Sequence, residues 1–200
     1  MPEIIIPGPE GRIEARYSPG NSAKPPLSII LHPHSRQGGT MNNKVVYHAF
    51  QAFKSLGFAT LRFNFRGVGK SQGSYDNGVG ELTDAASALD WLQGENPGAR
   101  STWIAGFSFG SWLALQLLMR RPEIAGFVTV SPPANLYDFS FLALCPSSGL
   151  IIQGTEDKIV EIESVSELVT KLNKQKPLNI TYKKFAGADQ DKLNKAFSRN

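Results

Sequence analysis

The chain has 200 residues, 41% of them hydrophobic, so it is long enough to bury one substantial core and is expected to form a single domain over residues 1–200. Its net charge of +4 comes from lysines and arginines that are scattered among acids, a distribution that argues against nucleic-acid binding. The sequence shows neither a secretory signal nor an apolar run of membrane-spanning length, and its one cysteine, Cys145, excludes an internal disulfide framework, so we expect a cytoplasmic protein.

Extended and helical patterns alternate in the first half of the chain. Two extended runs joined by a turn rich in proline and glycine predict an antiparallel hairpin at a sheet edge, with strands at Glu3–Ile6 and Arg12–Tyr17. The continuous apolar run Leu27–Leu31 indicates a strand covered on both faces, as in a parallel sheet. The next predicted elements are a helix at about Asn43–Leu56, a strand at Ala59–Phe63 and a helix at Glu81–Leu92.

A serine between two glycines follows the next predicted strand. Trp103–Ala105 is short and apolar, residues 106–110 spell Gly-Phe-Ser-Phe-Gly, and apolar residues recur at helical spacing from Trp112 to Met119. A strand, a tight turn and a helix around Gly-x-Ser-x-Gly are the setting of a nucleophile elbow. Small flanking residues let strand and helix pass closely, and the strained turn would expose the Ser108 hydroxyl beside the free N–H groups of the helix.

The second half of the chain continues the alternation. Its predicted elements are a strand at Ile124–Val130, a long loop at Ser131–Ser148, a strand at Gly149–Gln153, a helix at Ile162–Leu172 and a last strand at Leu178–Phe185. Because strands and helices alternate with short connections, the sequence predicts an α/β fold with a doubly wound, mainly parallel sheet of about eight strands and helices on both faces. The polar segment Lys192–Asn200 supplies about two helical turns at most, so a C-terminal helix is expected to be short or missing.

Several segments together resemble the α/β-hydrolase superfamily, and most closely its small uncharacterised bacterial hydrolases with little or no cap domain. They are the His-Pro-His loop that ends in GGTMNNK, the strand exit NFRGVGKSQG, the elbow GFSFG and the segment GTEDKIV, within a likeness that covers about residues 2–189. The resemblance implies Ser108 as nucleophile, Asp157 as the acid of a catalytic triad, and an oxyanion hole made by the main-chain N–H of Phe109 and one from the loop after Leu31. We take His34 as the candidate for that second donor. Asp157 also lies just past a predicted strand, on the rim of the serine, although a turn aspartate bonded to its own backbone is the alternative.

The third member of the triad is the difficulty. The resemblance places a histidine directly after Ala-Asp in the loop that follows the last strand, and Gln190 occupies that position. Glutamine has no titratable nitrogen near neutral pH, so it cannot take the proton of the serine. Three explanations stay open: an altered end of an ordinary hydrolase, a descendant that binds without cleaving, or a base supplied by another histidine. The candidates for that base are His32, His34 and His48.

Two further groups of residues have more than one interpretation. Arg66 is expected to form a structural ion pair with Asp84 or Glu81 rather than to be solvated. Three aromatic residues of the long loop either line an acyl pocket or pack in the core: Tyr137, Phe139 and Phe141.

The sequence therefore predicts a serine hydrolase that acts on an ester, a thioester or a related acyl bond, impaired where Gln190 replaces the base. The alternative is a non-catalytic binding or interaction protein that retains the hydrolase fold. A peptidase of the same fold shares every residue discussed and differs only in substrate. No metal or organic cofactor is implied. The expected partner is a small acyl substrate, with neither nucleic acid nor membrane, and a second copy of the chain is a candidate partner.

Overall fold

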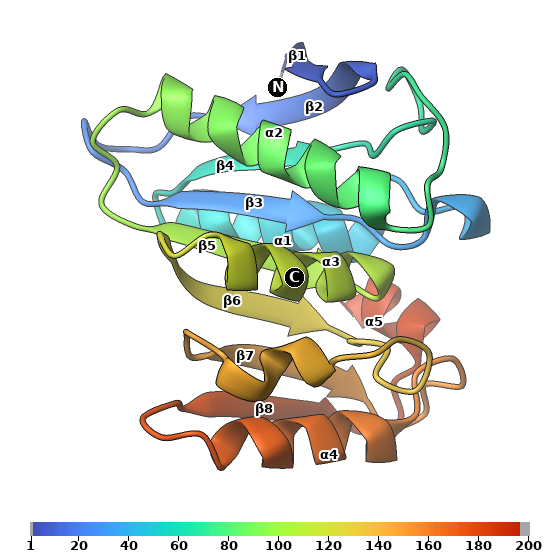
Figure 1. The fold of residues 1–200 in the computed structure, drawn as a ribbon. Helices are drawn as coiled ribbons and strands as arrows, with labels where there is room; N and C mark the ends of the chain where they lie inside the picture. Colours follow the sequence, from blue (N-terminus) through green and yellow to red (C-terminus); the bar gives the residue numbers. More distant parts are fainter. Residues whose placement is uncertain (1, 197–200) are drawn as a thin grey trace.

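An eight-stranded sheet organises the structure, a computed structural model that describes residues 2–196 (Figure 1). The strands are β1 (Glu3–Gly8), β2 (Gly11–Ser18), β3 (Leu27–Leu31), β4 (Ala59–Phe63), β5 (Thr102–Phe107), β6 (Ile124–Val130), β7 (Gly149–Gly154) and β8 (Ile180–Phe185). Their order across the sheet is β1-β2-β4-β3-β5-β6-β7-β8. β2 pairs antiparallel with β1 and with β4, and every neighbouring pair from β4 to β8 is parallel. The predicted edge hairpin and mainly parallel sheet are confirmed.

Helices cover both faces of this sheet. They are α1 (Lys44–Ser55), α2 (Val79–Glu95), α3 (Phe109–Arg120), α4 (Ile162–Asn173) and α5 (Gln190–Ala196), together with the 3₁₀ helices η1 (Ser35–Gln37) and η2 (Ser140–Leu144). Figure 1 shows α2, α3 and α4 on one face and α1 with α5 on the other, as a doubly wound fold requires. Within residues 2–196, none of the helices combines the length and the apolar character needed to cross a membrane.

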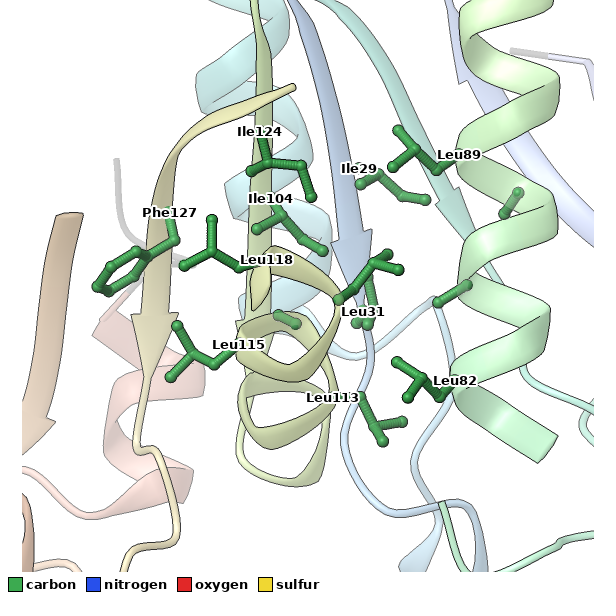
Figure 2. Packing of buried hydrophobic residues seen from close by; sticks show 14 of the residues in the cluster. Ile29, Leu31, Leu82, Leu89, Ile104, Leu113, Leu115, Leu118, Ile124 and Phe127 are labelled. Carbon is green, nitrogen blue, oxygen red and sulfur yellow. The ribbon is translucent and has the colours of Figure 1, made fainter. Parts of the chain in front are cut away.

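The larger hydrophobic core lies between the sheet and α2, α3 and α4. Figure 2 shows apolar side chains of β3 and β5 facing those of α2 and α3. Ile29, Leu31 and Ile104 lie on the sheet, and Leu113 lies on α3. A smaller cluster fills the opposite face under α1 and α5. Because both faces of β3 are covered, all five of its residues are buried, and four of them are apolar. The fifth, Ser28, donates its hydroxyl to Oγ1 of Thr60 at 2.9 Å.

The element boundaries differ from the predicted ones mainly where apolar periodicity gives no signal. α2 extends beyond the predicted Glu81–Leu92 at both ends, and β8 begins at Ile180 rather than Leu178. The short 3₁₀ helices were not predicted, because a single tight turn has no repeat to detect. α5 is a seven-residue helix, in line with the expected short C-terminal helix, and residues 197–200 of the predicted segment lie outside the described residues.

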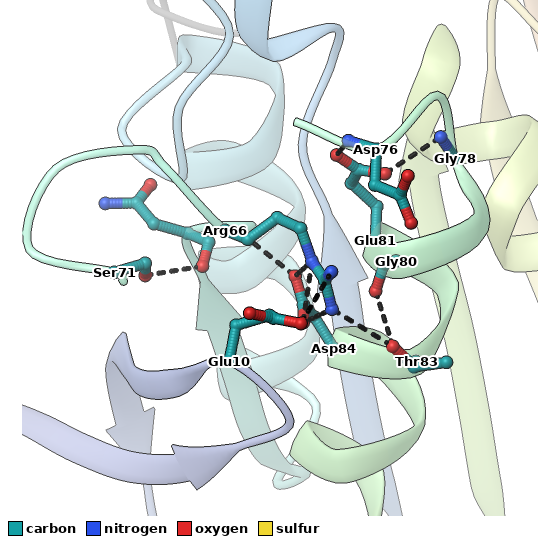
Figure 3. A network of polar contacts seen from close by, with 10 residues as sticks. Glu10, Arg66, Ser71, Asp76, Gly78, Gly80, Glu81, Thr83 and Asp84 are labelled. Carbon is teal, nitrogen blue, oxygen red and sulfur yellow. Dashed lines mark hydrogen bonds and ion pairs between the residues drawn. The ribbon is translucent and has the colours of Figure 1, made fainter. Parts of the chain in front are cut away.

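Arg66 forms the predicted structural ion pair, and its partner is Asp84. The guanidinium binds the carboxylate of α2 through two hydrogen bonds, from Nε to Oδ2 at 3.0 Å and from Nη2 to Oδ1 at 2.8 Å (Figure 3). Glu81 is not the partner, because its carboxylate accepts the N–H groups of Asp76 and Gly78 at the start of α2. The side chains of Arg66 and Asp84 are 7% and 1% exposed. This buried ion pair therefore attaches the loop that follows β4 to α2.

Removing one partner of this pair is expected to be strongly destabilising. Asp84→Ala would leave the buried guanidinium without its carboxylate, and we expect the free energy of unfolding to fall by about 3–5 kcal/mol. Glu10 is the matched control, because it approaches Arg66 at 3.7 Å from a side chain that is 57% exposed, and Glu10→Gln should cost less than about 1 kcal/mol. Urea denaturation of the three proteins measures both effects, and equal midpoints for Asp84→Ala and the unmodified chain would refute the structural role.

Candidate active site

Ser108 sits on a sharp turn between the end of β5 and the start of α3. Its backbone has φ 52° and ψ −119°, a conformation that residues other than glycine rarely adopt and that costs on the order of 1–3 kcal/mol. The turn is held in place because the Ser108 N–H donates to the carbonyl oxygen of Val130 in β6, at 2.9 Å. The strained backbone turns the serine away from both regular elements, as the elbow motif predicts.

The two glycines of the motif are required by close backbone approach. A Cβ atom on Gly106 would overlap the carbonyl oxygen of Gly110, and a Cβ atom on Gly110 would overlap the carbonyl oxygen of Leu31. Both obstacles are backbone atoms, so they cannot move aside as a side chain would. The glycines thus let β3, β5 and α3 converge below the serine.

A cavity of about 550 Å³ opens at the carboxyl ends of the parallel strands and contains the serine. Its lining comes from the loop after β3, the elbow, the loop after β7 and the segment after β8, and comprises Pro33, His34, Gln37, Gly38, Gly39, Asn43, Phe107, Ser108, Asp157, Lys158, Ile159, Asp189, Gln190 and Asp191. This edge of an open α/β sheet is where ligands usually bind, and the volume is in the range of small-molecule pockets. Four predicted site residues therefore meet in one cavity: His34, Ser108, Asp157 and Gln190.

Asp157 lies in the loop that follows β7 and is tied to that loop by its own hydrogen bonds. Its Oδ1 accepts the N–H groups of Ile159 and Val160, each at 2.9 Å, as in the turn aspartate considered as an alternative. Among the residues that the structure describes, its Oδ2 receives a single long contact, of 3.4 Å, from Nε2 of Gln153. One oxygen of the carboxylate thus holds the turn, while the other keeps acceptor capacity on a residue that lines the cavity.

Gln190 is the first residue of α5 and lines the same cavity. Its Nε2 atom is buried and has no hydrogen-bond partner among the described residues. An amide nitrogen is only a donor, so this side chain presents a hydrogen-bond donor at the position where the resemblance places a base. As it stands, the cavity combines a serine and a carboxylate with a residue that cannot accept a proton.

The two oxyanion donors predicted from the sequence are the main-chain N–H groups of Phe109 and His34. Phe109 is the first residue of α3, and helices leave the N–H groups of their first turn without intrahelical partners. The positive end of the helix dipole reinforces this site. His34, proposed for the second donor, lines the cavity, and its ring packs on Phe109 with centroids 4.9 Å apart.

The ring nitrogens of His32 and His34 are both engaged by other groups. In His32, Nε2 accepts the N–H of Phe65 at 3.0 Å, so Nδ1 carries the proton that is donated to the carbonyl oxygen of Pro33 at 2.7 Å. In His34, Nδ1 accepts the N–H of Arg36 at 3.2 Å and Nε2 lies 3.0 Å from Oη of Tyr75. These contacts favour structural roles over that of a relocated base. His48 lines a separate apolar hollow beside α1 rather than the cavity of Ser108.

Burial gives His32 a marked effect on stability at acidic pH. The ring is fully buried, and this burial lowers its pKa to about 4, although the bond to Pro33 opposes the shift. Since the unfolded chain takes up a proton near pH 6.5 and the folded chain does not, the free energy of unfolding should fall as the pH decreases from 6.5 to 4, by on the order of 3 kcal/mol. Urea denaturation at several pH values measures this loss, and a His32→Gln variant should lack this contribution. An unchanged pH dependence in that variant would contradict the assignment.

The aromatic residues of the long loop pack against the core instead of lining the cavity of Ser108. The ring of Tyr137 stacks on Trp112 at 4.4 Å and also contacts Phe109. Phe139 stacks on Phe141 at 5.9 Å. Of the two interpretations of these residues, the structure supports packing.

Cys145 is a buried thiol whose pKa is raised by burial.

Several residues at the site carry no motif and were not predicted. Gln153 is the next-to-last residue of β7 and is fully buried. Its Nε2 donates to the carbonyl oxygens of Gly154 and Val160 and contacts Asp157. A polar residue at the end of an apolar strand was the available signal. Lys158 and Asn43 line the cavity through loop geometry that the sequence pattern does not reveal.

Comparisons with known proteins agree with this geometry. The sequence model of the X-Pro dipeptidyl-peptidase (S15 family) matches residues 12–146, which include Ser108. An uncharacterized protein of Rickettsia prowazekii is 55% identical over 193 residues, which are 94% of this chain and 81% of that protein.

Solved structures give the same result. A candidate alpha/beta hydrolase of unknown function from Agrobacterium tumefaciens superposes with a TM-score of 0.93 at 53% identity, over 98% of this chain and 92% of the other. A member of the α/β serine hydrolases without a lid, from Xanthomonas campestris, superposes with a TM-score of 0.86 at 32% identity, over 98% and 91% of the two chains.

Proposed function

Because this chain belongs to the α/β-hydrolase superfamily, we propose that it is a serine hydrolase acting on an ester, a thioester or a related acyl bond. The match of residues 12–146 to the X-Pro dipeptidyl-peptidase (S15) family supports the same proposal. The observation that carries the proposal is the strained Ser108 in a cavity that also contains a strand-end carboxylate. Structural strain of this kind persists where the surrounding fold enforces it, and it clusters at active sites.

Each candidate residue has a role in the proposed reaction. The Ser108 oxygen attacks the acyl carbon, and the N–H groups of Phe109 and His34 hold the oxygen that becomes negative. Asp157 would orient a base and stabilise its protonated form. Gln190 stands where that base is expected and cannot take the proton, so we propose that turnover is impaired.

The alternative is a protein that binds an acyl compound without cleaving it. Gln190 is the observation in its favour, because its unpartnered Nε2 can donate to a ligand oxygen but cannot activate Ser108. The two functions share the fold and the cavity, so they differ only in whether covalent chemistry occurs at the serine.

Hydrolysis of short p-nitrophenyl esters tests the proposal. Their leaving group departs without being protonated, so the rate depends on the attack of the serine oxygen rather than on an acid. We expect the unmodified chain to be slower than an ordinary esterase by about 10²–10⁴-fold, the usual contribution of a general base. Ser108→Ala should lower the rate further, to the level supported by binding and oxyanion contacts alone. Equal rates for the two proteins would favour the binding alternative, whereas a rate typical of intact esterases would show that the missing base does not impair the site.

A further inference from the structure

The cavity around Ser108 has room for a molecule in addition to an acyl group. Its volume is about 550 Å³, and its lining comes from four separate segments of the chain. Two residues of α5 line it, Gln190 and Asp191, and the neutral amide at position 190 cannot accept the proton of Ser108. An imidazole or amine base beside position 190 would therefore have to come from outside the chain.

The unsatisfied atoms of the lining suit such a molecule. Within the described part of the chain, Oδ2 of Asp157 has only the 3.4 Å contact from Gln153, so it can accept a hydrogen bond from a ligand N–H group. Nε2 of Gln190 is a buried donor without a partner among residues 2–196, and leaving a buried donor unpaired costs about 1–3 kcal/mol. A small base with an N–H group beside Asp157 would use this acceptor.

The charge of the lining favours a molecule that becomes positive. Three carboxylates and one ammonium group line the cavity, so its net charge is −2 although the whole chain carries +4: Asp157, Asp189, Asp191 and Lys158. Opposite charges nearby stabilise the protonated form of a base. The cavity thus disfavours an anionic ligand and supports a base at the moment it takes up a proton.

We propose that this cavity binds a small imidazole or amine that acts as the base in place of a histidine, an inference that rests on the proposed function. The N–H of the bound base donates to Oδ2 of Asp157, and its unprotonated nitrogen takes the proton of Ser108 as the serine oxygen bonds to the acyl carbon. The bond from that carbon to the leaving group then breaks, and the protonated base returns its proton to the leaving group. Water repeats the sequence and releases the acid, so the base is regenerated unchanged.

Imidazole is the probe that tests this site. With a p-nitrophenyl ester, we expect imidazole to raise the rate of the unmodified chain by about tenfold or more and to saturate, above the blank without protein. N-methylimidazole is the matched control, because it keeps a basic nitrogen but has no N–H to donate to Asp157, and it should accelerate the reaction less. Ser108→Ala should show no saturable gain with either compound.

Two variants make the result specific. Gln190→Ala enlarges the space and should respond to imidazole more strongly than the unmodified chain. Asp157→Asn keeps the size of the side chain but removes its charge, so the advantage of imidazole over N-methylimidazole should disappear. A saturable acceleration that is the same for both compounds in every protein would overturn the proposed binding mode.

Gln190→His separates the failure of this inference from the failure of the proposed function. If that variant hydrolyses the ester while imidazole leaves the unmodified chain unchanged, the serine hydrolase assignment stands and the external base is refuted. If neither the Gln190→His substitution nor the addition of imidazole to the unmodified chain gives turnover, both proposals fail. An imidazole group can also be carried by the substrate, and comparing the methyl esters of histidine and phenylalanine distinguishes that source from free imidazole.

Discussion

Replacing Gln190 with histidine should raise the hydrolysis of a short aryl ester by about 10²–10⁴-fold. The reason is that this residue lines the cavity of Ser108 together with Asp157, so an imidazole ring at this position has a serine proton to take and a carboxylate to orient it. The substitution should raise kcat and leave KM nearly unchanged, because the base acts on the reacting atoms rather than on substrate binding. Steady-state kinetics of the two proteins provide the measurement.

Matched variants show whether the gain has this origin. Gln190→Asn changes the same side chain without adding a base and should leave the rate near that of the unmodified chain. Adding Ser108→Ala to Gln190→His should remove the entire gain, because residues that act as a unit are not additive. If Gln190→His folds normally and gains nothing, α5 does not place this residue where a base can reach the serine.

The pH profile offers a second check on the same variant. A histidine base must be neutral to accept a proton, so the rate of Gln190→His should rise as the pH passes the pKa of the new imidazole, whose ordinary value is about 6.5. The Asp157 carboxylate should shift this midpoint upward, since a nearby negative charge stabilises the imidazolium. The unmodified chain should lack this titration.

The sequence was most informative where local pattern and global fold agree. Continuous apolar runs such as Leu27–Leu31 predicted buried parallel strands, and the glycines around Ser108 predicted a turn that the structure shows at φ 52°. The glycine pattern arises from a steric requirement and the apolar run from burial on both faces of the sheet. Both are visible within a few consecutive residues, so they can be recognised in a single chain.

Contacts between distant segments could not be predicted in the same way. The choice of Asp84 over Glu81 as the partner of Arg66 depends on which turn of α2 faces the exit of β4. The support that Gln153 gives to the Asp157 loop, and the unpaired Nε2 of Gln190, likewise depend on how loops after separate strands converge. A sequence pattern carries the type of these residues but not their distances.

Labelling with a fluorophosphonate tests the central assignment of Ser108 most directly, because the reagent bonds to a nucleophilic serine oxygen and its position can be found by peptide mass spectrometry. We predict one adduct on Ser108, formed slowly in the unmodified chain, faster in Gln190→His, and absent in Ser108→Ala. An adduct on another residue, or none on Ser108 even in folded Gln190→His, would contradict it.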